Sequence, residues 1–182
     1  MTNVHVALLR GINVGGKNPV PMKALAEEFA AAGCKDVRTY IQSGNVVFCA
    51  PDAAVRKLAK KMAASIEARF GCRVPVVLRN VAELELAITR NPYAKRPEFG
   101  NYTHLMFLAD EPGADAVRGL DPKRSSPDEF TVVGRDVYLW MPGGMGKTRL
   151  TNAYFDSKLK TVSTVRNWRT VLTLAEMMGI SG

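Results

Sequence analysis

The chain is poor in the residues from which cross-links, metal sites and catalytic dyads are built. Three cysteines and two histidines occur among its 182 residues. Cys34, Cys49 and Cys72 are scattered without a C-x-x-C pair, so the sequence predicts free thiols in a reducing compartment and excludes a disulfide framework or a zinc site. His5 and His104 lie near the starts of two predicted strands, where a buried structural role is the more common one.

Other absences narrow the function further. No apolar run reaches the roughly 18 residues that a membrane helix needs, and the first residues lack the regions of a signal peptide. We therefore expect a cytoplasmic protein without a membrane partner. The patterns H-E-x-x-H, G-x-S-x-G and paired carboxylates are all missing. The sequence consequently names no reaction, catalytic residue, cofactor or metal ligand, and it leaves the oligomeric state open.

Positive charge is abundant but unevenly placed. The net charge is +8, and residues 100–140 are acidic while the segments on both sides are basic. An excess of positive charge attracts phosphates, nucleotides and nucleic acid, although it also serves solubility alone. Two classes of partner are therefore open, a small anionic ligand and a nucleic acid.

The hydrophobic patterns predict an α+β fold made of two ferredoxin-like halves. In the first half, strands and helices follow the order β-α-β-β-α-β, which is the split βαβ plan. The second half is a diverged version that gains extra C-terminal helices. His5 and His104, at like places in the two halves, favour a duplication. We expect the halves at residues 1–92 and 101–182.

The expected strands are 4–9, 37–41, 46–49, 73–78, 103–109, 130–133 and 137–141. The expected helices are 21–32, 51–70, 81–89, 114–120, 152–160 and 165–178. Ser163 or Thr164 is expected to cap the last of these helices. Pro75 favours an edge position for the fourth strand, because proline cannot donate to a neighbouring strand.

The glycine-rich loop from Arg10 to Asn18 is the most informative segment. It leaves a predicted strand and precedes a predicted helix, and it carries Gly15, Gly16 and Lys17. Glycine lets a ligand approach backbone N–H groups closely, and such groups near a helix start bind anions well. The alternative is that the two glycines make a tight turn and that Lys17 is merely solvated.

A second glycine-rich loop precedes Lys147 and Thr148. It resembles a P-loop, but the first glycine of that motif is replaced by Met141, so a nucleoside triphosphatase site is excluded. The loop remains a candidate for anion binding or a flexible connection. Arg166 and Asn167 are expected on the exposed side of the last helix, where they could contact phosphates.

The segment from Thr39 to Phe48 places polar groups at a hairpin tip. Gln42, Ser43 and Asn45 either shape this turn through hydrogen bonds to the backbone or line a pocket beside Arg10. The aromatic pair with which RNA-recognition domains stack bases is missing from this strand.

Several motifs together resemble the bacterial domain-of-unknown-function family 1697. They are Val6–Asn18, Pro21-Met22, Arg38–Phe48, Gly146–Asn152, Ser157–Leu159 and Thr164–Val171. The resemblance spans nearly the whole chain and implies a two-part α+β protein built on ferredoxin-like units. It implies no activity and no catalytic residue. Family members often carry Ser-Lys where this chain has Thr148-Arg149, and the exchange keeps a hydroxyl and a cation.

The first hypothesis is a protein that binds a small phosphate-bearing ligand, with or without catalysis, mainly through the loop from Arg10 to Asn18. The alternative is a nucleic-acid-binding module that uses the basic surface and the C-terminal helices, and the blandest option is a scaffold whose motifs serve the fold alone. The expected ligand-binding residues are Arg10, Asn13, Gly15, Gly16, Lys17, Gln42, Ser43, Asn45, Lys147, Thr148, Arg166 and Asn167.

Overall fold

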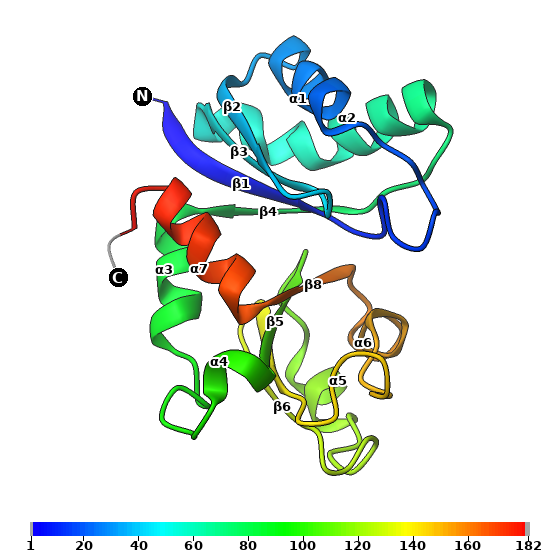
Figure 1. Ribbon diagram of the computed structural model, residues 1–182, viewed down its shortest axis with the longest axis vertical. Coiled ribbons are helices and arrows are strands. Elements are labelled where there is room, and N and C mark those ends of the chain that lie inside the picture. The colour runs from blue at the N-terminus through cyan, green and yellow to red at the C-terminus, as the bar shows by residue number, and fades with distance from the viewer. Residues whose placement is uncertain (1, 181–182) are drawn as a thin grey trace. The chain divides into compact units, whose positions relative to one another are not determined.

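The computed structural model describes residues 2–180 and confirms the α+β prediction (Figure 1). It contains two four-stranded antiparallel sheets, each accompanied by helices. In the first sheet the strand order is β2-β3-β1-β4, and in the second it is β6-β7-β5-β8. Both orders are the same arrangement of a β-α-β-β-α-β chain, so each half is ferredoxin-like and the two halves resemble each other.

The elements of the first half follow the predicted order closely. They are β1 (Asn3–Leu9), α1 (Met22–Ala31), β2 (Lys35–Tyr40), β3 (Asn45–Ala50), α2 (Asp52–Phe70), β4 (Val76–Asn80) and α3 (Val81–Thr89). The strand β4 is an edge strand, as Pro75 predicted, and Pro75 lies immediately before it.

The second half repeats the plan with shorter helices between its strands. Its elements are α4 (Phe99–Tyr102), β5 (Thr103–Leu108), α5 (Ala114–Arg118), β6 (Glu129–Val133), β7 (Asp136–Trp140), α6 (Asn152–Leu159), β8 (Ser163–Asn167) and α7 (Trp168–Met177).

The described chain forms two compact units, and unit 1 consists of two segments that are separate in the sequence. Unit 1 is Met1–Glu85 with Thr173–Gly182, and unit 2 is Leu86–Leu172. The helices α3 and α7 therefore each begin in one unit and end in the other. Compactness does not test which segments fold independently, so the domain ranges 1–92 and 101–182 remain predictions.

Each sheet buries one face under its own pair of helices. In unit 1, Ala7, Leu9 and Phe48 pack with buried residues of α1 and α2. In unit 2, Met106, Leu108 and Leu139 pack with Phe155 and its neighbours on α6. The spacing of apolar residues in the helices and the apolar character of the strands predict that these side chains face the core.

One predicted element is wrong. The expected helix at 165–178 starts too early, because Ser163–Asn167 is the strand β8 and the helix α7 begins only at Trp168. The β-branched pair Thr164 and Val165 extends the chain beside β5, where Met106 pairs with Val165. Ser163 and Thr164 are consequently strand residues rather than helix caps. The cap is Asn167, whose Oδ1 accepts a hydrogen bond from the N–H of Thr170 at 2.8 Å.

The resemblance of the halves extends to individual side chains. His5 pairs with Asn80 across β1 and β4, and His104 pairs with Asn167 across β5 and β8. One residue before each asparagine lies an arginine, Arg79 or Arg166, and both arginines are buried. Each asparagine then caps the helix that follows its strand. A shared set of polar positions in two equivalent sheets supports descent of both halves from one unit.

We expect Gly44→Ala to destabilise the protein strongly. Gly44 has a φ of +77°, and an added Cβ would lie 2.7 Å from Cβ of Leu9. Backbone strain and overpacking together should cost about 3 kcal/mol of unfolding free energy. Gly71→Ala is the matched control, since Gly71 has a φ of +69° with open space around it, and strain alone should cost about 1 kcal/mol. Urea denaturation measures both, and equal losses would contradict the prediction.

Candidate functional site

The loop that follows β1 is a small hairpin with an exposed tip. The N–H of Lys17 donates to the carbonyl oxygen of Val14 at 3.0 Å, and the two residues form an isolated β-bridge. Between them Gly15 and Gly16 have φ values of 57° and 73°. Two successive residues with positive φ are the signature of a type I′ turn, for which Gly-Gly is well suited. The tight-turn interpretation of the glycines therefore describes the backbone.

Two asparagines hold the base of this hairpin. Asn13 and Asn18 both have positive φ, and the N–H of Asn13 donates to the carbonyl oxygen of Asn18 at 3.1 Å. The Asn13 amide donates to the carbonyl oxygens of Val20 at 2.8 Å and Gln42 at 2.9 Å, and it accepts from the N–H of Val20 at 2.8 Å. The Asn18 amide donates to the carbonyl oxygen of Gly11 at 2.8 Å. Side chains thus fix the loop to its neighbours while leaving the tip in solvent.

The hairpin does not have the geometry of a phosphate loop at a helix start. The helix α1 begins at Met22 after Pro21, well beyond the glycines, and the N–H of Lys17 is used within the turn. What the tip presents is different. Val14, Gly15, Gly16 and Lys17 are exposed, and the Lys17 ammonium has no hydrogen-bond or ion-pair partner among the described residues. The tip is therefore a cation with two exposed glycine N–H groups beside it.

The structure joins the turn after β2 to this loop. Asn13 bonds to the carbonyl of Gln42, and the N–H of Leu9 donates to the carbonyl oxygen of Gly44 at 2.8 Å. Asn45 is buried, and its amide donates to the carbonyl oxygen of Tyr40 at 3.1 Å and to Oγ of Ser43 at 3.0 Å. Asn45 and Ser43 thereby stabilise the turn, as the first of the two sequence interpretations had it.

In unit 2 the second glycine-rich loop is tied to the loop before β6 through Ser125. Its Oγ accepts from the N–H of Arg149 at 2.9 Å, donates to Oδ2 of Asp128 at 2.8 Å and lies 3.3 Å from Oγ1 of Thr148. Lys147 is exposed next to this network. The two loops bring Arg124 close as well, since its Nε donates to the carbonyl oxygen of Arg149 at 3.0 Å. Ser125 and Arg124 were not among the expected site residues, and no local motif marks them.

Arg166 and Asn167 have local structural roles in unit 2. Arg166 is buried in β8, where its guanidinium donates to Oγ1 of Thr164 and to the carbonyl oxygen of Val165, each at 2.8 Å. Burial lowers the pKa of Arg166 to about 10. The expected exposed position of Arg166 is therefore wrong. Its counterpart Arg79 was missed, although the repeated Arg-Asn pair in the sequence could have revealed it.

The described structure places one histidine, His5, beside a carboxylate. The Nε2 of His5 lies 3.2 Å from Oδ1 of Asp52, and the Asn3 amide donates to the other carboxylate oxygen at 2.8 Å. A hollow of about 300 Å³ beside this pair is lined by Asn3, Val4, Asp52, Asn80, Val81 and Ala82, with no serine, threonine, cysteine or lysine among them. Burial lowers the pKa of His104 below its ordinary value. His5 and Asp52 therefore lack the serine or cysteine that would complete a catalytic triad at this hollow.

Within residues 2–180, no group of three His, Cys, Asp or Glu side chains could hold a metal ion. The three cysteines are free. None of the described helices has the length and hydropathy needed to cross a bilayer.

Comparison with known proteins identifies relatives without identifying a reaction. A family model described as a protein of unknown function, DUF1697, matches residues 1–138. The conserved bacterial protein SP0830 from Streptococcus pneumoniae has a similar solved structure, with a TM-score of 0.72 and 24% sequence identity, over 98% of this chain and 99% of that one. At that identity the likeness shows the fold alone. No curated protein matches the chain.

We predict that the Asn13 side chain contributes more to stability than that of Asn18. Both residues have positive φ, so substitution by glycine removes the side chain without adding strain. Asn13→Gly loses three hydrogen bonds to the main chain and should lower the unfolding free energy by about 2–3 kcal/mol, whereas Asn18→Gly loses one and should lower it by about 1 kcal/mol. Chemical denaturation of both variants is the measurement. Similar losses would show that the Asn13 bonds do not anchor the loop.

Proposed function

The chain belongs to the DUF1697 family, to which no function is assigned, and from that premise we propose that it binds a small phosphate-bearing ligand through the hairpin between β1 and α1. The observation that carries the proposal is the exposed tip of the hairpin. There an ammonium without a partner stands next to two glycines that have no side chain to shield their N–H groups.

The chemistry of the tip suits a phosphate better than a neutral ligand. A cation and adjacent backbone donors can share the oxygens of one phosphate, and the missing Cβ atoms allow close approach. Rigidity supports this role, because the hydrogen bonds of Asn13 and Asn18 define the loop before a ligand arrives. The polar residues Gln42 and Ser43 lie on the adjoining turn and supply further contacts in this proposal.

The expected contributions from the second half are proposals of their own. Lys147 and Thr148 stand on a loop that Ser125 holds in place, so they could bind an anion within unit 2. Arg166 is buried and Asn167 caps α7, which makes both weaker candidates for direct contact with a ligand. The proposal therefore depends on Arg10 to Lys17 and treats the other positions as secondary.

Nucleic-acid binding is the second candidate, and α2 favours it. Arg56, Lys57, Lys60 and Lys61 are exposed on two successive turns of this helix. Farther along, Arg69 pairs with Glu27 and Glu28, and Arg73 pairs with Glu67. The uncompensated charge is thus concentrated on the first half of α2, where the helix dipole adds to it. A row of cations on one helix face matches a phosphate backbone.

We expect Lys17→Ala to weaken phosphate binding, because the variant removes the cation of the tip and leaves the turn intact. Thermal-shift assays with inorganic phosphate, adenosine triphosphate and a hexose phosphate would identify a probe; a ligand at 100 times its dissociation constant adds about 2.7 kcal/mol of stability. The dissociation constant of that probe should rise about tenfold in Lys17→Ala, by analogy with other charged contacts. Arg10→Ala should act in the same direction.

Lys23→Ala provides the control, since Lys23 is exposed on α1 outside the hairpin. Its dissociation constant should equal that of the unmodified protein. The proposal is wrong if none of the three probes stabilises the protein, or if Lys17→Ala and Lys23→Ala bind equally well.

The second candidate predicts a steep salt dependence. If all four cations of α2 contact single-stranded DNA, the logarithm of the association constant should fall with the logarithm of salt concentration with a slope of about −3. Replacing the four cations by glutamine should bring the slope close to zero. The control is Arg69→Gln with Arg73→Gln, because both arginines already pair with glutamates and should leave the slope unchanged. A flat response in the unmodified chain removes this candidate.

A further inference from the structure

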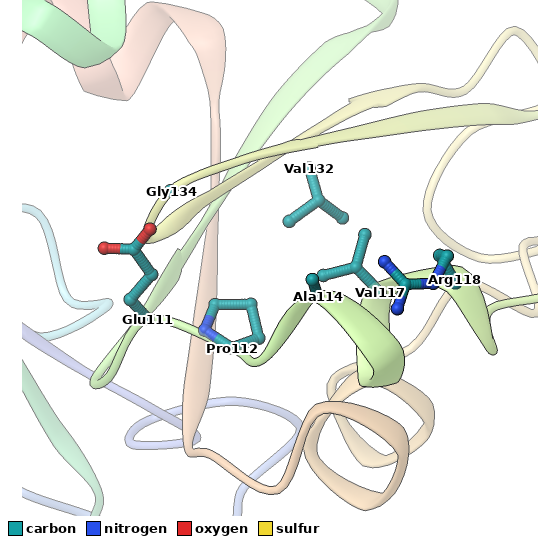
Figure 2. Close-up of a pocket in the computed structure, with 7 residues that line it drawn as sticks. All are labelled: Glu111, Pro112, Ala114, Val117, Arg118, Val132 and Gly134. Carbon is teal, nitrogen blue, oxygen red and sulfur yellow. The ribbon is translucent and has the colours of Figure 1, made fainter.

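A groove opens beside the edge strand β6 in unit 2. Its volume is about 450 Å³, and Figure 2 shows the side chains that line it: Glu111, Pro112, Ala114, Val117, Arg118, Val132 and Gly134. The residues before and within α5 form one wall, and the last part of β6 forms the other. The middle of the groove is apolar, because valine, alanine and proline lie there between the two charged residues (Figure 2).

The helix that follows the first strand of each half differs in length and in burial. The helix α1 has ten residues and buries Met22, Leu25 and Phe29 against its sheet. Its counterpart α5 has five residues, and none of them is buried. Val117 is only partly buried, although it packs on the core of unit 2. The shorter helix α5 therefore covers less of its sheet than α1 does in unit 1.

The edge of β6 is also open to another strand. The sheet ends at β6, and its register with β7 runs unbroken from Glu129 to Val133. A two-residue turn follows Val133, so Val133 shares its hydrogen bonds with Asp136, and alternation directs the N–H and C=O groups of Phe130 and Val132 away from the sheet. These groups point to the side on which an added strand would lie.

The corresponding edge of unit 1 is protected. The strand β2 carries an irregular register between Lys35 and Arg38, and Asp36 has a positive φ of 49°. Bulges and charges of this kind prevent a further strand from pairing. The strand β6 has neither a register shift nor a charge after Glu129, which is paired with Arg96. One half of a duplicated protein thus keeps an open edge that the other half blocks.

Charges at the two ends of the groove define what fits it. Glu111 lies beside Gly134 at one end, and Arg118 lies at the other (Figure 2). Arg118 also forms an exposed ion pair with Asp115 of the same helix. A complementary occupant carries a positive group toward Glu111, a negative group toward Arg118 and an apolar side chain between them.

We propose that the edge of β6 binds an extended peptide segment of a partner protein, in which one apolar residue stands between a basic and an acidic residue. The peptide adds a fifth strand to the sheet, and its backbone pairs with Phe130 and Val132. Its apolar side chain covers Val117 and Val132. A second copy of this chain is the less favourable occupant, because antiparallel pairing of two β6 strands would bring Glu129 of one copy toward the Glu111 end of the other.

Four acetylated and amidated pentapeptides with a central Thr-Val-Thr run test the proposal on the full chain, because alternation then places one valine between the two end residues on the same face. Two carry lysine and glutamate at opposite ends, in either order, and two carry the same charge at both ends. We expect one of the mixed-charge peptides to bind best by fluorescence anisotropy, at least about fivefold better than the like-charged ones, as charge complementarity requires. Its binding should protect the amides of Phe130 and Val132 from hydrogen exchange.

An exchange of charges in the protein provides the matched variant. Glu111→Lys combined with Arg118→Glu should reverse the preferred order of lysine and glutamate in the peptide, which a variant that merely folds poorly cannot do. N-methylation of the peptide on the edge that faces β6 should abolish binding, whereas methylation on the other edge should not.

Three outcomes would overturn the proposal. They are absence of binding by either mixed-charge peptide at millimolar concentration, an unchanged order preference in the charge-exchanged variant, and dimerisation of the free protein that Val132→Lys abolishes, which would make a second copy the occupant.

Discussion

The need to cover a central strand on both faces governs this structure. In unit 1, Val6, Ala7, Leu8 and Leu9 of β1 are all fully buried, and in unit 2 the same holds within 1% for Leu105 to Leu108 of β5. Successive residues of a strand point to opposite faces, so neither sheet can leave one of its faces in water at these strands. Polar chemistry is therefore displaced to the loops at strand ends and to the edge strands. The hairpin after β1 and the groove beside β6 are found in those two kinds of place.

Sequence patterns predicted most of the fold because the spacing of apolar residues determines the helices and strands, and proline and glycine mark where many of them begin and end. The boundaries of α2, for example, follow from Pro51 before the helix and Gly71 after it. The predicted start of the last helix was wrong because the spacing of Val165 and Trp168 fits the apolar face of a helix, and it fits equally well a strand followed by a helix. Pairing between Met106 and Val165, far apart in the chain, decides between the two, and no local pattern contains that information.

The candidate site was predictable in position but not in geometry. Gly15, Gly16 and Lys17 mark the loop in the sequence, and they do form its exposed tip. The direction of the backbone N–H groups depends on bonds that Asn13 makes to Val20 and to Gln42, and the second of these crosses 29 positions of sequence. The buried Arg79 was likewise hidden, because an arginine in a strand gives no signal of burial until the equivalent Arg166 is aligned with it.

The division of α7 between the units has a consequence for how the protein is made. Thr173–Gly182 belongs to unit 1, and a guanidinium nitrogen of Arg38 in β2 donates to the carbonyl oxygen of Met177 at 2.6 Å. During synthesis, all four strands of the first sheet leave the ribosome early. The segment 173–182 of unit 1 follows only after every strand of the second sheet has been translated. The amino-terminal half therefore cannot reach its final form until the last residues of the chain have been made, and the bond between Arg38 and Met177 forms only after translation of both halves.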